Sequence, residues 1–207
     1  MEQRRALEAD QAVLELAAAV RKAIGDEYRF MVDANHCYTT SDAFHVGRGL
    51  EDLNAYWFEE PIAPEDHAGY RELRAGLEIN ISGGEAEFNR WGWRSLLETR
   101  GLDIAQPEVC ALGGISEYLR VLALCHAHFT PVVNHVWGSA VAVAANMHLL
   151  AAMPDLPGGL PPWDLTLMGS YPSGSDPVGS DPMGSDTMGS DRVESDHMGS
   201  DLMVRPR

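Results

Sequence analysis

The sequence predicts an α/β fold, a partial parallel β/α barrel, because helical patterns alternate with short apolar runs that lead into evenly spaced carboxylates. Asp33, Glu59 and Glu85 each end or follow such a run, and the two intervals between them are each 26 residues. That interval fits one strand and one helix of a βα repeat. Because the carboxyl ends of neighbouring strands meet on one face of a parallel barrel, the three side chains are expected to converge there.

Five apolar runs are the expected strands, and each leads into a polar residue. They lie at about 28–32, 56–58, 79–81, 102–107 and 131–134. Helical patterns lie at about 2–24, 40–54, 65–76, 87–98, 116–128 and 138–153. Gly25 is a stop signal for the first helix, and Thr40, Ser41 and Asp42 are cap candidates for the second. Five strands are fewer than the eight of a closed barrel, so two unpaired strand edges are expected.

The residues at the strand ends indicate a metal-assisted proton transfer. Three converging carboxylates need a cation, and Mg²⁺ is the natural one because it prefers carboxylate and water oxygens. Glu108 and His135 follow the next two strands. By its order around a barrel, His135 faces a substrate held on the metal, and an imidazole there can move a proton at neutral pH. Glu108, on the neighbouring strand, can hold the ring by hydrogen bonding.

Several phrases resemble one known family. They are VDAN at 32–35, WFEEP at 57–61, GGE at 83–85, QPE at 106–108 and HVWG at 135–138. From about residue 4 to about residue 163 the chain resembles the mandelate racemase and muconate lactonizing branch of the enolase superfamily, most closely its sugar-acid dehydratases and galactarolactone cycloisomerases. The resemblance implies a C-terminal barrel domain in which Asp33, Glu59 and Glu85 bind Mg²⁺, His135 is the acid/base and Asn35 contacts the substrate.

The chain also departs from that family. Relatives carry an aspartate where this chain has Glu108, which is one methylene longer and still able to reach His135. Relatives begin with a capping domain and two further barrel strands, the second with a Lys-x-Lys or similar basic motif, whereas Lys22 is the only lysine here. Two hypotheses stay open: an Mg²⁺-dependent lyase or isomerase acting on a sugar acid or its lactone, or a catalytically incompetent truncated fragment or interaction remnant of such an enzyme.

Other polar and aromatic residues have plainer interpretations. Glu60, beside Glu59, is expected to point the other way along its strand and to support the site or form an ion pair. Trp137 follows His135 closely enough to be a candidate for lining the pocket. The histidines interpreted as surface or packing residues are His36, His67, His126, His128 and His148.

Composition divides the chain into a barrel-like domain at 1–168 and a tail at 169–207. The tail repeats a Gly-Ser-Asp unit, has no long apolar run and is expected to be disordered. A net charge of -16 argues against nucleic acid and anionic membranes as partners. The family resemblance implies a small sugar acid or other hydroxy acid as the partner. The three cysteines and the amino-terminal residues suggest neither a disulfide framework nor a signal peptide, which predicts a cytoplasmic protein. Relatives often form homo-oligomers, and the sequence leaves the oligomeric state open.

Overall fold

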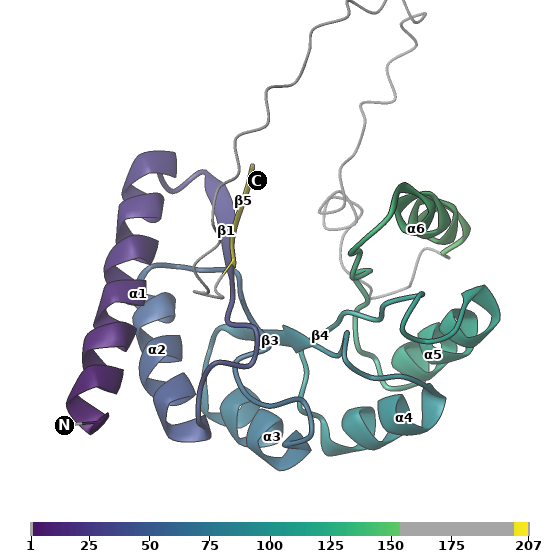
Figure 1. Cartoon of the computed structure of the whole chain (residues 1–207), viewed down its shortest axis with the longest axis horizontal. Coiled ribbons are helices and arrows are strands. Elements are labelled where there is room, and N and C mark those ends of the chain that lie inside the picture. The colour runs from purple at the N-terminus through teal and green to yellow at the C-terminus, as the bar shows by residue number, and fades with distance from the viewer. Residues whose placement is uncertain (1, 154–200, 207) are drawn as a thin grey trace, which may run out of the picture.

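The computed structural model describes residues 2–153 and 201–206. Along the chain these residues form α1 (Glu2–Ile24), β1 (Tyr28–Asp33), α2 (Thr40–Asp52), β2 (Trp57–Glu59), α3 (His67–Gly76), β3 (Asn80–Gly83), α4 (Arg90–Thr99), β4 (Ile104–Ala105), α5 (Ile115–Ala127), α6 (Ala140–Ala152) and β5 (Asp201–Pro206). The helices form an outer arc around the strands (Figure 1). The predicted α/β alternation is therefore confirmed.

The sheet has the order β4-β3-β2-β1-β5, and β1 to β4 are parallel. In this register Asp33 lies opposite Glu59, and Glu59 lies opposite Ser82. The fifth expected strand is reduced to isolated parallel bridges that join Ala105 to Val132 and Glu108 to His135. The arc of strand ends thus continues past β4 and brings His135 alongside Glu108.

Two apolar clusters follow from the alternation of side chains along each strand. Phe30, Val32 and Phe58 belong to the larger cluster, which also contains buried residues of the helices. The smaller cluster contains the alternate strand residues Met31 and Trp57, together with Ile104 and Val133. Its side chains stand one layer below the carboxylates that end the strands, so an apolar layer supports the polar one.

Side-chain caps set where the helices begin. Thr39 accepts a hydrogen bond from the backbone N–H of Asp42, so the cap of α2 precedes the three cap candidates predicted from the sequence. Asn89 accepts from the N–H groups of Trp91 and Gly92 and therefore starts α4 three residues later than predicted. Each cap satisfies N–H groups that lack a partner within the helix.

The last described strand differs from the expectation of disorder in the tail. β5 pairs antiparallel with β1 over six positions, from Tyr28 opposite Pro206 to Asp33 opposite Asp201. An open edge of β1 would expose backbone N–H and C=O groups, and pairing with β5 satisfies them. The remainder of the predicted tail, and the part of the predicted barrel domain after residue 153, lie outside the described residues. None of the described helices has the length and apolar character needed to cross a membrane.

Candidate active site

The predicted acidic residues lie at the carboxyl ends of neighbouring strands. Asp33 ends β1 and Glu59 ends β2, and the two are register partners. The carboxylate of Glu59 is buried, with 3% of the residue exposed, and its Oε2 accepts a hydrogen bond of 3.0 Å from Nε1 of Trp57. The backbone N–H of Asn35 donates to Oδ1 of Asp33 at 2.8 Å. Both carboxylates are therefore held by neighbours in their own local segments.

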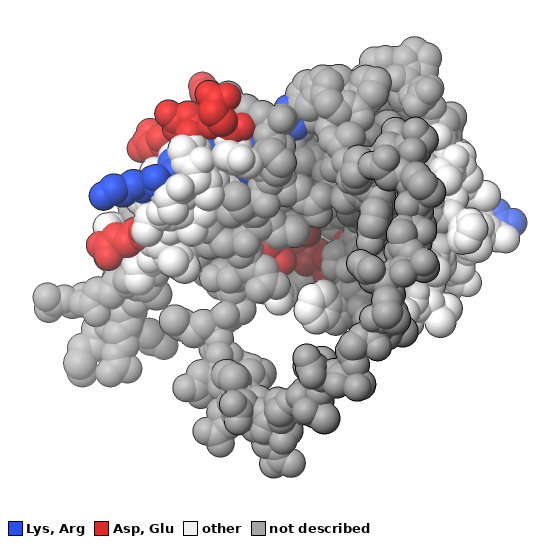
Figure 2. Space-filling view, turned by 90° about the horizontal axis from the view of Figure 1, so that it is seen from above, with Lys and Arg blue, Asp and Glu red and all other residues white. Residues whose placement is uncertain are grey.

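The electrostatics of Glu59 show that the acidic residues interact. Burial raises the pKa of Glu59, and the nearby charges of Asp33 and Glu85 raise it further, to about 7, although hydrogen bonds from Gln106 and Trp57 oppose the shift. Seen from above, acidic side chains are recessed near the centre of the molecule (Figure 2). A bound cation would stabilise the ionised form of a buried carboxylate in such surroundings.

A tight turn after β3 carries Glu85. Gly84 in this turn has a φ of 108°, a backbone conformation that residues other than glycine rarely adopt. A Cβ at this position would lie 2.4 Å from the ring of Trp93, which is fully buried. The backbone of the turn therefore packs directly on α4, and this contact fixes the position from which Glu85 extends.

His135 lies between two carboxylates. Its Nδ1 is 3.0 Å from Oε2 of Glu108, and its Nε2 is 2.9 Å from Oε2 of Glu85. Burial alone would lower the pKa of His135, but hydrogen bonds and charges from Glu85 and then Glu108 raise it to about 9. Glu108 is itself fixed, because its oxygens accept from the backbone N–H groups of Cys110 at 2.9 Å and Trp137 at 3.3 Å. The longer side chain of Glu108 thus reaches the imidazole.

Carboxylate oxygens are the kind of ligand that a hard divalent cation such as Mg²⁺ prefers. In the part of the chain that the structure describes, no three or more Asp, Glu, His or Cys side chains are arranged as a set of metal ligands. Glu85 instead contacts His135. Within the same part of the chain, two further buried oxygens beside Glu59, Oγ of Ser82 and Oε1 of Gln106, lack hydrogen-bond partners. A cation would neutralise this oxygen-rich pocket once Glu85 turned toward Asp33 and Glu59.

The two predicted substrate-contact residues lie at the edge of the candidate site. Asn35 is exposed and has φ of 45°, and it follows Asp33 directly in the loop after β1. Trp137 is 77% exposed, and its link to the site is the backbone hydrogen bond to Glu108. Both side chains are exposed and so are accessible to a ligand above the strand ends. The hydrogen bonds that link these two residues to the acidic residues come from their backbone N–H groups.

Sequence reasoning missed a second pairing of a histidine with a carboxylate. Nε2 of His36 lies 2.5 Å from Oε2 of Glu60, and Glu60 is 2% exposed. Burial, followed by the charges of Glu85, Asp33 and Glu59, raises the pKa of Glu60 to about 8. The interpretation of His36 as a surface or packing histidine did not include this contact. A signal was present in the position of both residues just beyond the ends of neighbouring strands.

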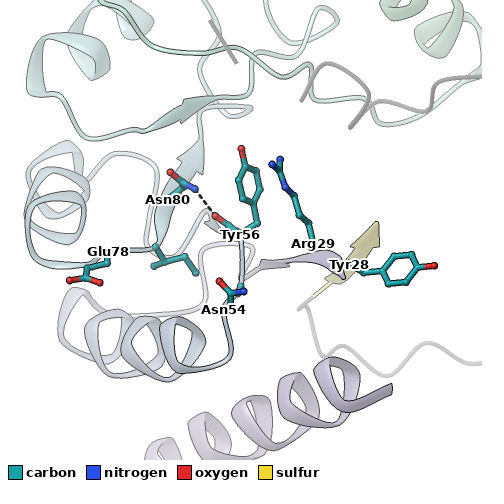
Figure 3. Close-up of a pocket in the computed structure, with 8 residues that line it drawn as sticks. Tyr28, Arg29, Asn54, Tyr56, Glu78 and Asn80 are labelled. Atoms are coloured by element: carbon teal, nitrogen blue, oxygen red, sulfur yellow. Dashed lines mark hydrogen bonds between the residues drawn. The ribbon is translucent and has the colours of Figure 1, made fainter. Parts of the chain in front are cut away.

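A cavity of about 590 Å³ lies at the opposite, amino-terminal ends of β1, β2 and β3. Figure 3 shows Arg29 beside Tyr56, and the guanidinium carbon lies 4.3 Å from the centre of the Tyr56 ring. Asn80 donates from Nδ2 to the carbonyl oxygen of Tyr56 at 2.7 Å. Polar groups at this end stabilise barrels, whereas chemistry takes place at the carboxyl ends. The cavity is therefore separate from the candidate site.

A parallel β/α arc with acidic residues and a histidine at its strand ends defines an enolase-type barrel domain. Residues 6–159 match the family described as enolase C-terminal domain-like, and the chain belongs to that family. The resemblance predicted from the sequence is therefore confirmed.

Similar proteins include sugar-acid enzymes. The D-galactarolactone cycloisomerase of Agrobacterium fabrum is 42% identical over 143 residues, which cover 69% of this chain and 38% of that protein. The L-talarate/galactarate dehydratase of Salmonella typhimurium is 34% identical over 145 residues, which cover 70% of this chain and 34% of that protein. The chain thus spans little more than a third of the length of these relatives.

Solved structures give the same result. The 3,6-anhydro-D-galactonate cycloisomerase of Zobellia galactanivorans superposes with a TM-score of 0.69 at 41% identity, covering 72% of this chain and 42% of that one. A variant L-talarate/galactarate dehydratase liganded with Mg and L-glucarate has a TM-score of 0.64 at 33% identity, covering 70% of this chain and 35% of that one. Cycloisomerases and dehydratases are thus among the proteins that this chain is similar to, and the variant dehydratase was solved with Mg, the metal predicted here.

Proposed function

We propose that this chain carries the metal-binding and proton-transfer residues of an Mg²⁺-dependent lyase or isomerase that acts on a sugar acid or its lactone. The observation that supports this most strongly is the placement of His135, which lies between Glu108 and Glu85 at the same end of the strands as Asp33 and Glu59. An acid/base beside a group of carboxylates that can hold a cation suits proton abstraction next to a carboxylate.

Asp33, Glu59 and Glu85 are the residues that would hold the ion. An ion held there would supply positive charge close to where negative charge develops on the substrate carboxylate. The raised pKa of Glu59 supports this role, because a carboxylate that resists ionisation in a buried acidic pocket gains most from a cation. The side-chain amide of Gln106 adds a hydrogen bond that keeps Glu59 oriented.

His135 would move the proton at Nε2. Glu108 occupies Nδ1 and keeps the ring in one orientation, so Nε2 is the nitrogen that can face a substrate. Nε2 contacts Glu85, which helps to raise the pKa of His135 to about 9 and so keeps the ring protonated. Proton abstraction needs this contact to break, so that Nε2 gives up its proton and faces the substrate. The proton then leaves the carbon next to the substrate carboxylate and is bound by the imidazole.

The relatives, a galactarolactone cycloisomerase and a talarate/galactarate dehydratase among them, support the proposed substrate class. A dehydratase expels a hydroxyl group from the enediolate, and a cycloisomerase expels the ring oxygen of a lactone, so the same first step serves both reactions. Asn35, next to Asp33, would offer an amide to the hydroxyl groups of a sugar acid. The proposed substrate is therefore a hydroxylated carboxylic acid. The leaving group present in that substrate determines whether the reaction is a dehydration or a cycloisomerisation.

Exchange of the α-proton in D₂O tests this proposal. The protein is incubated with Mg²⁺ and galactarate, or with galactarolactone, and deuterium incorporation is followed by NMR. We expect exchange or turnover with the unmodified chain and its loss in His135→Asn. Mg²⁺ binding without exchange of any sugar acid would instead support the alternative, a chain that retains the site but does not catalyse.

A further inference from the structure

We propose that His67 is a positioning residue for the turn that carries Glu85 and that it acts through Glu87. The proposal deepens the function given above and rests on it in one respect, the role of Glu85 as a metal ligand. His67 is the first residue of α3, in the segment that follows Glu59, whereas Glu87 lies two residues after Glu85. The pair therefore connects two loops that each follow a proposed metal ligand.

The contact between them is short and largely shielded from water. Nε2 of His67 lies 2.9 Å from Oε1 of Glu87. The side chains are 21% and 15% exposed. A polar contact shielded in this way restrains its partners more than an exposed surface pair, whose side chains are free to separate in water.

Glu87 connects this contact to the backbone of the turn. Its N–H donates to the carbonyl oxygen of Gly84 at 3.1 Å, which closes the turn around Glu85. Its second carboxylate oxygen lies against the first turn of α4, because a Cβ at Gly92 would stand 2.0 Å from Oε2. A carboxylate at the amino end of a helix is favourable, since the N–H groups there carry partial positive charge. Glu87 is thus fixed by α4 on one side and by His67 on the other.

His67 starts from a well-fixed position. Asp66, the preceding residue, caps α3 by accepting from the N–H of Gly69 at 2.9 Å. Its other oxygen accepts from Oγ1 of Thr40, the first residue of α2, at 3.3 Å. The start of α3 is thereby held to the start of α2. Through its contact with Glu87, His67 in turn restrains the position of the turn that carries Glu85. Removing the imidazole would take away the link between that turn and α3.

A neighbouring ion pair provides a matched control. Arg90 binds Glu117 through Nε at 2.7 Å and Nη2 at 2.6 Å and so joins α4 to α5. This pair also links the starts of two successive helices, but its hydrogen bonds within the described part of the chain join Arg90, Glu117 and Arg120 and do not reach Glu85. Loss of either pair would lower stability. We expect the metal site to change when the His67 contact is lost and to stay unchanged when the Arg90 pair is lost.

The experiment compares His67→Leu, His67→Gln and Arg90→Gln in the full chain, with Mg²⁺ affinity measured by isothermal titration calorimetry. The side-chain amide of glutamine places a donor close to the position of Nε2, so His67→Gln should keep most of the affinity. Loss of a residue that orients a metal ligand typically weakens metal binding by about 10- to 100-fold, and His67→Leu should fall in that range. Arg90→Gln should bind Mg²⁺ as the unmodified chain does. Unchanged affinity in His67→Leu, or equal losses in Leu and Gln, would overturn the proposal.

A second measurement keeps the result independent of the proposed metal. Hydrogen exchange of the Glu87 amide reports the hydrogen bond to Gly84 directly. We expect faster exchange of this amide in His67→Leu than in His67→Gln or Arg90→Gln. If the unmodified chain binds no Mg²⁺, the proposed function fails, and exchange alone then decides the positioning claim: an unchanged rate in His67→Leu would reject it.

Discussion

Nε2 of His135 lies 2.9 Å from Oε2 of Glu85, so the proposed acid/base and one proposed metal ligand contact each other directly. Glu85 is thus held toward His135, and among the described residues it is not grouped with Asp33 and Glu59 as a set of metal ligands. It also means that binding of a cation and release of the imidazole are linked, because the same carboxylate takes part in both.

His135→Asn tests this link. Removing the imidazole frees Glu85 from a competing contact, and a protein already in its binding-competent arrangement binds more tightly than one that must rearrange. We expect Mg²⁺ affinity at least equal to that of the unmodified chain, measured by isothermal titration calorimetry. Clearly weaker binding in His135→Asn would show that His135 supports the metal site.

The pH dependence of stability follows from two raised pKa values. Glu59 is raised from 4.5 to about 7, so its contribution to stability is complete below pH 4.5 and is lost as pH rises through 7. The pKa of His135 is raised from 6.5 to about 9, so its contribution is likewise lost as pH rises through 9. For Glu59 the loss is on the order of 3 kcal/mol. Urea denaturation without metal should therefore show lower stability at pH 8 than at pH 5.

Mg²⁺ should reverse that trend. Protons compete with the ion for Glu59 at low pH, so stabilisation by a fixed Mg²⁺ concentration is expected to be greater at pH 8 than at pH 5. Parallel denaturation curves with Mg²⁺ and with EDTA provide the comparison. A stabilisation that is equal at both pH values would indicate binding somewhere other than the buried carboxylate.

Gly84→Ala should destabilise the turn after β3 strongly. The new Cβ would meet the ring of Trp93 at 2.4 Å and would also occupy a backbone conformation that suits glycine. The two effects together should lower the free energy of unfolding by about 3 kcal/mol. Gly113→Ala is the control, because Gly113 also has positive φ but has open space around its Cβ position. Equal losses in the two variants would contradict close packing of Gly84 on Trp93.

Glu108→Gln should lower the pKa of His135. The substitution keeps the length of the side chain but removes the negative charge 3.0 Å from Nδ1, which helps to raise this pKa. NMR titration of the imidazole in the metal-free chain measures the effect. An unchanged pKa would assign the shift to Glu85 alone.

Periodicity allowed much of the fold to be predicted. The alternation of strands and helices, and the placement of Asp33 opposite Glu59, follow from equal spacing and from apolar residues that repeat with the period of a strand. The start of α4 was predicted too early because a cap depends on which nearby polar side chain reaches the free N–H groups, and here Asn89 does so. The pairing of β5 with β1 joins segments far apart in the chain, which local patterns do not encode.

For the candidate site, the sequence predicted which strand ends the residues occupy better than it predicted their side-chain contacts. Strand-end positions identified Glu108 and His135 as neighbours, and the structure places them 3.0 Å apart. The contact of Glu85 with His135 depends on side-chain conformation, which spacing alone cannot give. The partner of His67 was missed for a related reason, because Glu87 reaches it from a turn and not from a strand end.

A thermal melt of the chain with Mg²⁺ or EDTA, followed by circular dichroism alongside Glu59→Gln, tests the central claim most directly. A ligand that binds only the folded form at about 100-fold excess over its Kd adds about 2.7 kcal/mol of stability. We predict that Mg²⁺ raises the Tm of the unmodified chain and leaves that of Glu59→Gln unchanged. Equal shifts in the two proteins, or no shift in the unmodified chain, would contradict the assignment of Asp33, Glu59 and Glu85 as the Mg²⁺ site.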